Sequence, residues 1–357
     1  MSINMQKSPP KHEEYPMNLN RLNEILAGLG KVKIAVVGDF FLDRYWDINT
    51  QLDELSVETG LVAWQVERVR VSPGAAGTVV NNLAALKAGT IYAVGFVGND
   101  GEGYELCKLL DNLGVDRTHL HSTDEQRTPC YTKPLREGVE MNRVDIKNRK
   151  PTSHELEQQI IQSLRQLAKE VDAILIMDQV SEPNCGVITA NVRDMLIELG
   201  QKQDSPIIYA DSREGISAFR HIIIKCNDRE ATEAFDLYTG ESPDPNLLEE
   251  CGLNLARRTE KIVFITMGSR GQLVVDLNAE KQCTLVPAIP VEGEIDICGA
   301  GDASSSAIVG ALAAGATPAE ASFLGNIASS ITIRKIGETG TASPGEILDV
   351  FRSNFGS

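Results

Sequence analysis

The chain has 357 residues, 42% of them hydrophobic and 24% charged, so it can bury a large core and is neither a disordered nor a fibrous sequence. Its 34 Lys and Arg residues against 50 Asp and Glu residues give a formal net charge of −16. That charge repels nucleic acid and anionic membrane surfaces, so we expect neither partner, although local backbone amides can still bind a small phosphate ligand.

The predicted elements alternate between short β-branched runs and longer helical patterns. Residues 1–32 are interpreted as an N-terminal extension with a short helix, in which 1–16 form a loose tail, and residues 33–357 as the main domain. Strands are expected at Lys33–Gly38, Ile91–Val97, Val171–Met177, Pro206–Ala210, His221–Lys225 and Lys261–Thr266. Helices are expected near Thr78–Lys87, Glu102–Leu113, Ser153–Lys169, Gly186–Leu199 and Asn246–Arg258. The alternation predicts an α/β fold with a doubly wound, mostly parallel sheet and helices on both faces.

Two segments, about 44–72 and 127–147, break this alternation with polar, alternating runs that are typical of strands. We expect them to form one small inserted β-sheet outside the main sheet. Such an insertion could cover a ligand crevice as a lid or present a dimer surface, and a homodimer through the lid is our expectation.

Polar side chains follow several predicted strands at the point where each strand ends. They are Asp39, Asp178, Asp211 and Asn227. Because ligands bind at the carboxyl ends of strands in open α/β sheets, these residues are predicted to share one rim. Each taken alone is more often a turn or helix cap.

The most informative stretch is Glu294-Ile-Asp-Ile-Cys-Gly-Ala-Gly-Asp302, followed by a run of small residues that suits a helix. Gly299 and Gly301 allow a ligand to approach the backbone closely, and helix N-termini bind anions. Asp302 in the first turn could accept a proton from a hydroxyl that attacks a phosphoryl group. The alternative is a capping carboxylate after a glycine turn, which a lone motif of this kind would favour.

Two further motifs supply context. Asn227 and Glu230 could organise a hydrated Mg²⁺ on nucleotide phosphates, or simply form a capping box. The stretch Thr266-Met-Gly-Ser-Arg-Gly271 places a tight glycine turn after an apolar strand, which a hairpin explains equally well.

Taken together, and in the order in which they occur along the chain, the motifs resemble those of the ribokinase-like sugar kinases, the phosphofructokinase B-type family. The resemblance rests on Asp-Ile-Cys-Gly-Ala-Gly-Asp, Asn-Asp-Arg-Glu, Thr-Met-Gly-Ser-Arg-Gly and the N-terminal Val-Val-Gly-Asp-Phe-Phe-Leu-Asp-Arg-Tyr-Trp. It covers about Lys33 to Ile347, and the N-terminal stretch is most similar to the bacterial heptose 7-phosphate kinases. It implies an ATP-dependent kinase of a sugar or sugar phosphate.

The resemblance also implies roles for individual residues. Asp302 matches the family's catalytic base, and Gly299, Ala300 and Gly301 match its anion hole. For the nucleotide and Mg²⁺ it implies Asn227, Glu230, Thr266, Gly268, Gly271 and Asn326, with Glu230 on the metal side. For the sugar it implies Asp43, and Asp296 lies where many members place a ligand for a monovalent cation such as K⁺.

The sequence departs from the family pattern mainly on the acceptor side. In Pro73-Gly74-Ala75-Ala76-Gly77-Thr78, Gly74 is retained, Ala75 replaces a second glycine and Thr78 replaces an asparagine that faces the sugar. Cys298 replaces the usual threonine, which weakens the expectation of a K⁺ site. Lys133 and Arg143 of the lid are candidates to bind an anion of the substrate, against the alternative of solvated strand charges.

Other classes of protein remain as alternatives. A nucleotide-dependent oxidoreductase is disfavoured because Gly38-Asp39-Phe40-Phe41 replaces a G-x-G-x-x-G turn after the first strand. A catalytically weak or inactive kinase-fold protein that binds a sugar or nucleotide is compatible with Ala75 and Thr78, but retention of Asp302 argues against it. No nucleotidyltransferase-like domain precedes the end at Ser357, so we expect a single activity.

The seven cysteines are widely spaced without a C-x-x-C pair, which indicates reduced thiols rather than disulfides or a zinc site. Residues 1–30 are too polar for a signal peptide, and no run approaches the roughly 18 apolar residues of a membrane span. We therefore expect a cytoplasmic protein.

Overall fold

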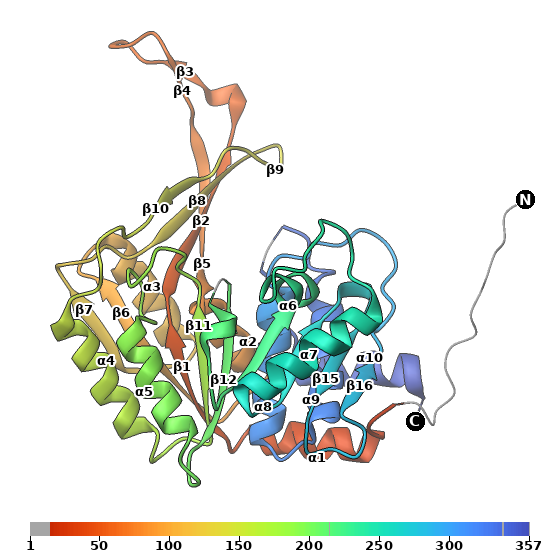
Figure 1. The fold of residues 1–357 in the computed structure, drawn as a ribbon. Helices are drawn as coiled ribbons and strands as arrows, with labels where there is room; N and C mark the ends of the chain where they lie inside the picture. The colour runs from red at the N-terminus through yellow and green to blue at the C-terminus, as the bar shows by residue number, and fades with distance from the viewer. Residues whose placement is uncertain (1–14, 214, 338, 357) are drawn as a thin grey trace, which may run out of the picture.

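The computed structural model describes residues 15–213, 215–337 and 339–356. Within them, nine strands form the central sheet, in the spatial order β7-β6-β1-β11-β12-β13-β14-β15-β16 (Figure 1). Their bounds in that order are Asp116–Thr123, Thr90–Gly98, Lys33–Gly38, Ala173–Asp178, Ile207–Ser212, Ile223–Asn227, Val263–Thr266, Gln272–Val275 and Cys283–Val286. The strands from β7 to β14 run parallel, and β15 and β16 are antiparallel. This confirms the predicted mostly parallel sheet.

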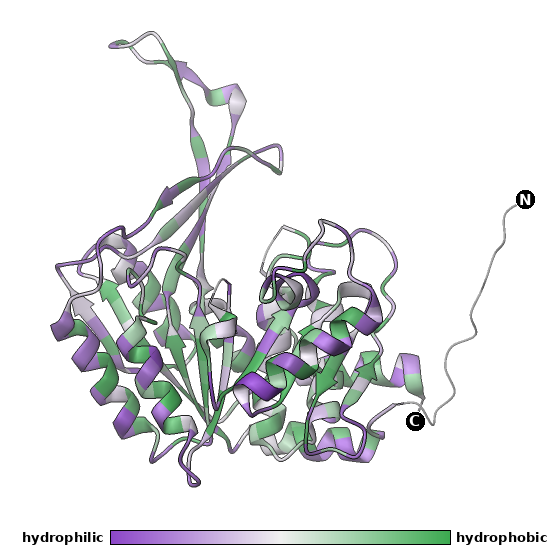
Figure 2. Ribbon diagram, in the orientation of Figure 1, coloured by the Kyte–Doolittle hydropathy of each residue, from purple (hydrophilic) through white to green (hydrophobic). Residues whose placement is uncertain are grey.

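Helices cover both faces of this sheet, because successive side chains of a buried strand point to opposite sides. In β1, Ile34 and Val36 face one hydrophobic core, and Ala35 and Val37 face the other. The first core holds α1 (Leu19–Leu29), α2 (Ala76–Ala85), α3 (Gly101–Asn112), α8 (Ala300–Ala313), α9 (Pro318–Thr332) and α10 (Pro344–Phe355). The second holds α4 (His154–Leu167), α5 (Ala190–Gly200), α6 (Asp228–Glu233) and α7 (Pro245–Thr259). Figure 2 shows the apolar strands enclosed between helices with polar outer faces.

Among the described residues, no helix has the length and apolar character needed to cross a bilayer.

The structure corrects the prediction of a helix from Gly186. The helix α5 begins only at Ala190, because Thr189 is its N-cap and accepts a hydrogen bond from the Val192 amide. The Val187 amide donates instead to the buried Asp39 carboxylate, at 2.7 Å. The segment before α5 is therefore fastened to the end of β1 rather than wound into the helix.

The inserted lid is a second sheet with strand order β10-β8-β2-β5, and β9 pairs with β8. These strands span Val144–Ile146, Cys130–Arg136, Phe40–Ile48, Val66–Ala75 and Val139–Glu140. A two-stranded ribbon, β3 (Glu54–Leu55) with β4 (Val62–Ala63), extends the β2/β5 hairpin far beyond the body of the molecule (Figure 1). The predicted lid segments thus form this second sheet and, in addition, the ribbon, which is a separate two-stranded sheet, whereas a single inserted sheet was expected.

The helix α1 lies within the body of the domain. Its Leu22, Ile25 and Leu29 are fully buried in the first core. The guanidinium of Arg21 binds the Glu320 carboxylate at 2.9 and 3.1 Å and the Gly315 carbonyl at 2.7 Å. The described part of the N-terminal segment is therefore fastened to the turn between α8 and α9. Residues 1–14 of the predicted tail lie outside the described residues.

Candidate active site

The four polar residues of the predicted rim lie at the carboxyl ends of the adjacent strands β1, β11, β12 and β13, with Asp39 just after β1 and the others within the last two residues of their strands. Asp39 accepts hydrogen bonds from the Val187 and Gln179 amides, and Asp178 accepts one from the Ser212 hydroxyl. The register places Met177 beside Asp211, which confirms that the strand ends meet at one edge. These hydrogen bonds indicate that Asp39 and Asp178 hold the backbone and side chains at this edge of the sheet in place.

A cavity of about 590 Å³ opens between this edge and the lid. It is lined by seven of the predicted site residues, namely Asp43, Ala75, Thr78, Lys133, Arg143, Gly299 and Asp302. The acceptor-side candidates from the lid and α2 thus face the proposed base and its glycine turn across one space. This is the arrangement that a group transfer between two substrates requires.

The acceptor wall depends on a close approach of two strands. In the register of β2 and β5, Phe41 pairs with Gly74 and Asp43 with Ser72. A β-carbon on Gly74 would lie 2.9 Å from the Asp43 carboxylate. Burial raises the pKa of Asp43, while Lys133 and Arg143 counteract that effect. Gly74 therefore makes room for Asp43 rather than offering a side chain of its own.

The two departures from the family pattern lie beside this wall. Ala75 has φ 53° and ψ −117°, a conformation that glycine adopts easily and a residue with a β-carbon adopts only under strain. Thr78 is buried, and its hydroxyl donates to the Pro73 carbonyl at 3.2 Å. The backbone at Ala75 thus has a conformation suited to glycine although the side chain is not glycine.

Cations reach the same cavity from the lid. The Lys133 ammonium lies over the Tyr45 ring, and the Arg143 guanidinium lies over the Tyr131 ring at 4.1 Å while it binds Asp145. Burial lowers the pKa of Lys133, but its interactions with Tyr45 and Asp43 outweigh this effect and raise the pKa. Both side chains are held by aromatic rings in positions where they line the cavity.

At the opposite wall, α8 begins with Gly299 as its N-cap, in a left-handed conformation with φ 75°. A β-carbon there would lie 2.7 Å from the Thr339 methyl group, so both the backbone conformation and the lack of space require glycine. The Ala300 amide donates to the Ile297 carbonyl at 3.2 Å. Among the described residues, the amides of Gly301 and Asp302 have no such acceptor, so they are the ones available to an anion.

Asp302 lies in the first turn of α8 and lines the cavity. Burial raises its pKa to about 7; Asp211 adds to the rise, and Lys225 and Arg213 oppose it. A carboxylic acid that titrates near neutral pH is matched to general base work at physiological pH. Position and pKa therefore both suit the role expected of it.

The Asn227 and Glu230 pair forms the capping box of α6. The Glu230 amide donates to the Asn227 side chain at 2.7 Å, and the Asn227 amide donates to Glu230 Oε2 at 2.8 Å. One oxygen of Glu230 thus holds the helix start and the other is left for a hydrated cation. No cluster of three or more His, Cys, Asp or Glu side chains suited to a metal occurs among the described residues. The residues present fit a Mg²⁺ that is bound mainly by substrate phosphates and water.

The remaining nucleotide candidates surround the β14/β15 hairpin. Thr266 donates to the Cys226 carbonyl at 3.4 Å, and Gly268 and Gly271 have positive φ in the turn. Asn326 donates to the Val286 and Pro287 carbonyls and anchors the end of β16. The hairpin interpretation of the glycine turn is therefore correct as geometry, and its contact with a nucleotide stays a prediction.

The monovalent-cation candidate is already engaged with the backbone. The carboxylate of Asp296 accepts the Cys298 amide at 3.0 Å and the Gly337 amide at 3.2 Å. These bonds order the loop that leads into α8. A K⁺ ion at this position stays a prediction.

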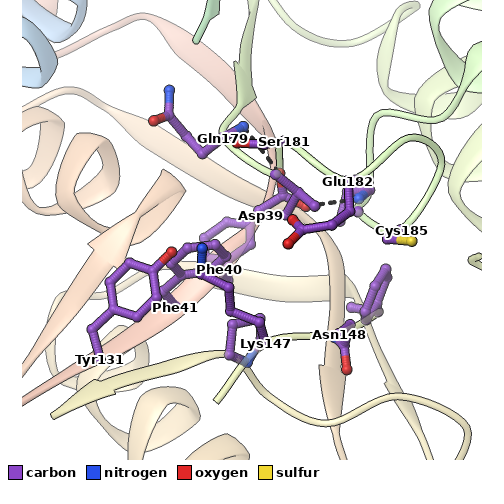
Figure 3. A pocket seen from close by; sticks show the side chains of 15 residues that line it. Asp39, Phe40, Phe41, Tyr131, Lys147, Asn148, Gln179, Ser181, Glu182 and Cys185 are labelled. Atoms are coloured by element: carbon purple, nitrogen blue, oxygen red, sulfur yellow. Dashed lines mark hydrogen bonds between the residues drawn. The ribbon is translucent and has the colours of Figure 1, made fainter. Parts of the chain in front are cut away.

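A second cavity, of about 430 Å³, adjoins the first and shares Phe41, Tyr131 and Gln179 with it. Figure 3 shows the rings of Phe40, Phe41 and Tyr131 gathered on one side and the Asp39 carboxylate on the other. The cavity between the sheet edge and the lid therefore has an aromatic extension toward the segment that Asp39 holds by hydrogen bonds.

The sequence reasoning missed two basic residues of the site. Arg213, directly after β12, lines the cavity and contributes to the pKa of Asp302. Lys225, in β13, is buried in an ion pair with Asp211 at 2.8 Å. Arg213 follows the predicted strand end at Asp211 by two residues, which was the one available signal. Lys225 lies within a predicted strand, where a basic residue indicates nothing by itself.

Residues 33–344 match the pfkB family of carbohydrate kinases, and the chain belongs to that family. Among curated proteins it is 27% identical over 339 residues to the bifunctional protein HldE of Trichlorobacter lovleyi, covering 93% of this chain and 65% of that protein. It is also 27% identical to HldE of Wolinella succinogenes, covering 92% and 67% respectively. The chain thus spans about two thirds of the length of these relatives.

Solved structures share the fold at low identity. Arabidopsis thaliana ribokinase in complex with ribose and ATP superimposes with a TM-score of 0.65 and 16% identity, over 90% of this chain and 99% of that one. Escherichia coli phosphofructokinase-2 in complex with potassium gives a TM-score of 0.70 and 18% identity over the same shares. The predicted ribokinase-like architecture is therefore confirmed.

Proposed function

We propose that this protein transfers the γ-phosphoryl group of ATP to a hydroxyl of a sugar or sugar phosphate. The observation that carries the proposal is the position of Asp302 and of the Gly301 amide at the start of α8, across one cavity from Asp43. Asp302 takes the proton of the attacking hydroxyl, and the exposed amides stabilise charge on the phosphoryl group. Asp43 holds the sugar by its hydroxyls.

The acceptor is itself anionic in this proposal. Lys133, Arg143 and Arg213 line the cavity from the lid and from β12, more positive charge than a neutral sugar requires. The adjoining aromatic cavity offers room for an acceptor longer than a pentose. The resemblance to heptose 7-phosphate kinases, and the HldE relatives, make heptose 7-phosphate the first acceptor to test, before fructose 6-phosphate, ribose and 2-keto-3-deoxygluconate.

Mg²⁺ accompanies the nucleotide and neutralises phosphate charge when it is bound. Asn227 and Glu230 would hold its hydration shell, Thr266, Gly268 and Gly271 would border the nucleotide, and Asp296 would serve a monovalent cation. The alternative, a kinase-fold protein that binds without turnover, is disfavoured by the retention of Asp302 directly after the Gly-Ala-Gly turn.

We further propose a homodimer formed through the lid in a reducing, cytoplasmic setting. Large apolar side chains lie exposed on the isolated ribbon and its base, namely Leu55, Val57, Leu61, Val62, Trp64 and Val69. A two-stranded ribbon is marginally stable alone, so a second copy is the natural cover for these residues. The seven cysteines are all free thiols.

The deciding experiment combines an acceptor screen with one substitution. Wild-type protein is assayed for ADP release with ATP and each of the four acceptors, and Asp302→Asn is assayed with the acceptor that reacts. We expect the variant to lose turnover by about 10³-fold or more while it still binds ATP. Near-normal turnover by Asp302→Asn, or no turnover by the wild type with any sugar or sugar phosphate, would contradict the proposal.

A further inference from the structure

A buried ion pair lies beneath the start of α8 and has no role in the function described above. Lys225 and Asp211 are each 6% exposed, and their charged atoms are 2.8 Å apart. The same Asp211 oxygen accepts the Ser305 hydroxyl at 2.8 Å. Burying two ions costs solvation free energy that their attraction repays only in part, so such a pair is weak evidence for a purely stabilising role. Its place in the fold is therefore informative.

That place is directly beneath Gly301. A β-carbon on Gly301 would lie 3.2 Å from the Lys225 Nζ, and outside the local helix backbone no other described atom is within 4 Å of that point. Gly301 is helical and has no positive φ, so its backbone does not require glycine. The missing side chain instead leaves a gap, and the ammonium group borders it.

The gap coincides with the anion-binding end of the site. The amides of Gly301 and Asp302 open at the first turn of α8, where a helix attracts negative charge. An ammonium group has three N–H donors, and among the described residues Asp211 is its hydrogen-bond acceptor. Two donors of Lys225 are thus left for a ligand at the gap.

The ammonium is charged in this setting. Burial alone would lower the pKa of Lys225, but its interactions with Asp211, Tyr209 and Glu230 outweigh this effect and raise the pKa above its usual value. Arg213 and Lys225 are also the two cations that oppose the raised pKa of Asp302. A permanent positive charge therefore lies next to the proposed base and the phosphate-binding turn.

We propose that Lys225 binds the transferring phosphoryl group through the gap left by Gly301, and that Asp211 positions its ammonium group. This inference rests on the proposed kinase function and adds a catalytic residue to it. Lys225 forms no covalent bond in the reaction; it stabilises the negative charge of the phosphoryl group as it moves between the two oxygens. Glycine is needed at 301 because a methyl group would separate the ammonium from that phosphate.

The test compares two nucleotides that differ only beyond the β-phosphate. Dissociation constants for ADP and for the non-hydrolysable ATP analogue AMP-PNP, each with Mg²⁺, are measured by calorimetry. Because Lys225→Met alone would leave Asp211 buried without its partner, the double variant Lys225→Met/Asp211→Asn removes both charges together. We expect it to bind AMP-PNP about tenfold or more weakly, while its affinity for ADP changes by less than about twofold.

A second variant tests the gap without touching the charges. Gly301→Ala should produce the same selective loss of AMP-PNP binding. Its matched control is Gly345→Ala in the first turn of α10, where the nearest atom to an added β-carbon is 4.0 Å away, and we expect that control to bind both nucleotides like the wild type.

A wild-type ratio of the two affinities in the folded double variant would overturn the role of Lys225 while leaving the kinase function intact. Failure of the wild-type protein to phosphorylate any acceptor would overturn the proposed function itself. Thermal unfolding of each variant shows that a changed ratio does not reflect loss of structure.

Discussion

The space that Gly74 leaves empty is filled by the carboxylate of Asp43, whose atoms would lie 2.9 to 3.0 Å from a β-carbon at that position. Gly74→Ala should therefore displace Asp43 from the acceptor without any backbone strain, since φ at Gly74 is not positive. We expect kcat/KM for the acceptor to fall about 10²-fold, the usual consequence of displacing a substrate-binding group by about 1 Å. The KM for ATP should stay unchanged.

The matched control for this variant is Gly101→Ala at the start of α3, where an added β-carbon meets no atom within 4 Å. It should have wild-type kinetics. Equal losses in the two variants, or a loss confined to ATP, would show that Asp43 does not contact the acceptor.

The raised pKa of Asp302 predicts a pH dependence of the rate. The base must be ionised, so kcat/KM should rise about tenfold per pH unit below pH 7 and level off above it. A steady-state profile from pH 5 to 9 with the best acceptor measures this. A flat profile across pH 7 would contradict the assignment of Asp302 as the base.

The same group predicts a stability effect of definite sign. Folded Asp302 retains its proton up to about pH 7, whereas the unfolded chain releases it near pH 4, so the free energy of unfolding falls as pH rises through this interval. Above pH 7 the cost amounts to at most about 4 kcal/mol. Asp302→Asn should therefore be more stable than the wild type at pH 8 and nearly equal to it at pH 4. Denaturant unfolding of both proteins at pH 4 and pH 8 tests this. Asp39 titrates in a similar way, but it is present in both proteins and drops out of the difference between them.

Ala75 predicts a stabilising substitution. Its backbone conformation costs about 1–3 kcal/mol in the folded state for a residue with a β-carbon. Glycine removes this strain, but its greater freedom stabilises the unfolded chain by less than about 1 kcal/mol. Ala75→Gly should raise the free energy of unfolding by about 1 kcal/mol. Ala85→Gly, at the end of the helix α2 that Ala75 precedes, changes a residue with ordinary backbone geometry and should lower the free energy of unfolding by a similar amount. A loss of stability in Ala75→Gly would exclude strain at this position.

The apolar ribbon predicts the oligomeric state. Leu61→Asp/Trp64→Asp should convert the wild-type dimer into a monomer in analytical ultracentrifugation, because charges cannot be buried unpaired between two copies. Tyr104→Asp changes an equally exposed residue of α3 on the body and should stay dimeric. A wild-type protein that sediments as a monomer would exclude the lid dimer.

Much of this arrangement could be predicted from the sequence because it depends on local pattern. The β-branched runs indicated the strands of the parallel sheet, and the glycines before Asp302 indicated the start of the helix α8. What could not be predicted depends on register and on neighbours far apart in the chain. The contact of Gly74 with Asp43 follows from the pairing of β2 with β5. Lys225 of β13 and Gly301 of α8 are likewise far apart in the chain, and only the fold brings the Lys225 ammonium near the start of α8.

The edge strands were missed for a related reason. β7 and β16 are the edge strands of the sheet, and both have exposed as well as buried residues. Short edge strands need not be apolar on both faces, so a search for buried runs passes over them. The strand β15 is buried but has only four residues. Val187 lies inside the predicted helix Gly186–Leu199, and its hydrogen bond to the distant Asp39 explains why α5 starts later.

The position of α1 also has a consequence for how the chain reaches its native state. The buried face of α1 meets Gly310 and Ala314 at the end of α8, and Tyr15 meets the ring of Phe355 at 4.3 Å. On the ribosome α1 emerges long before these partners, so its apolar side stays uncovered until α8 and α10 have been made. Chains that stop before α10 should therefore be substrates for chaperones and proteases.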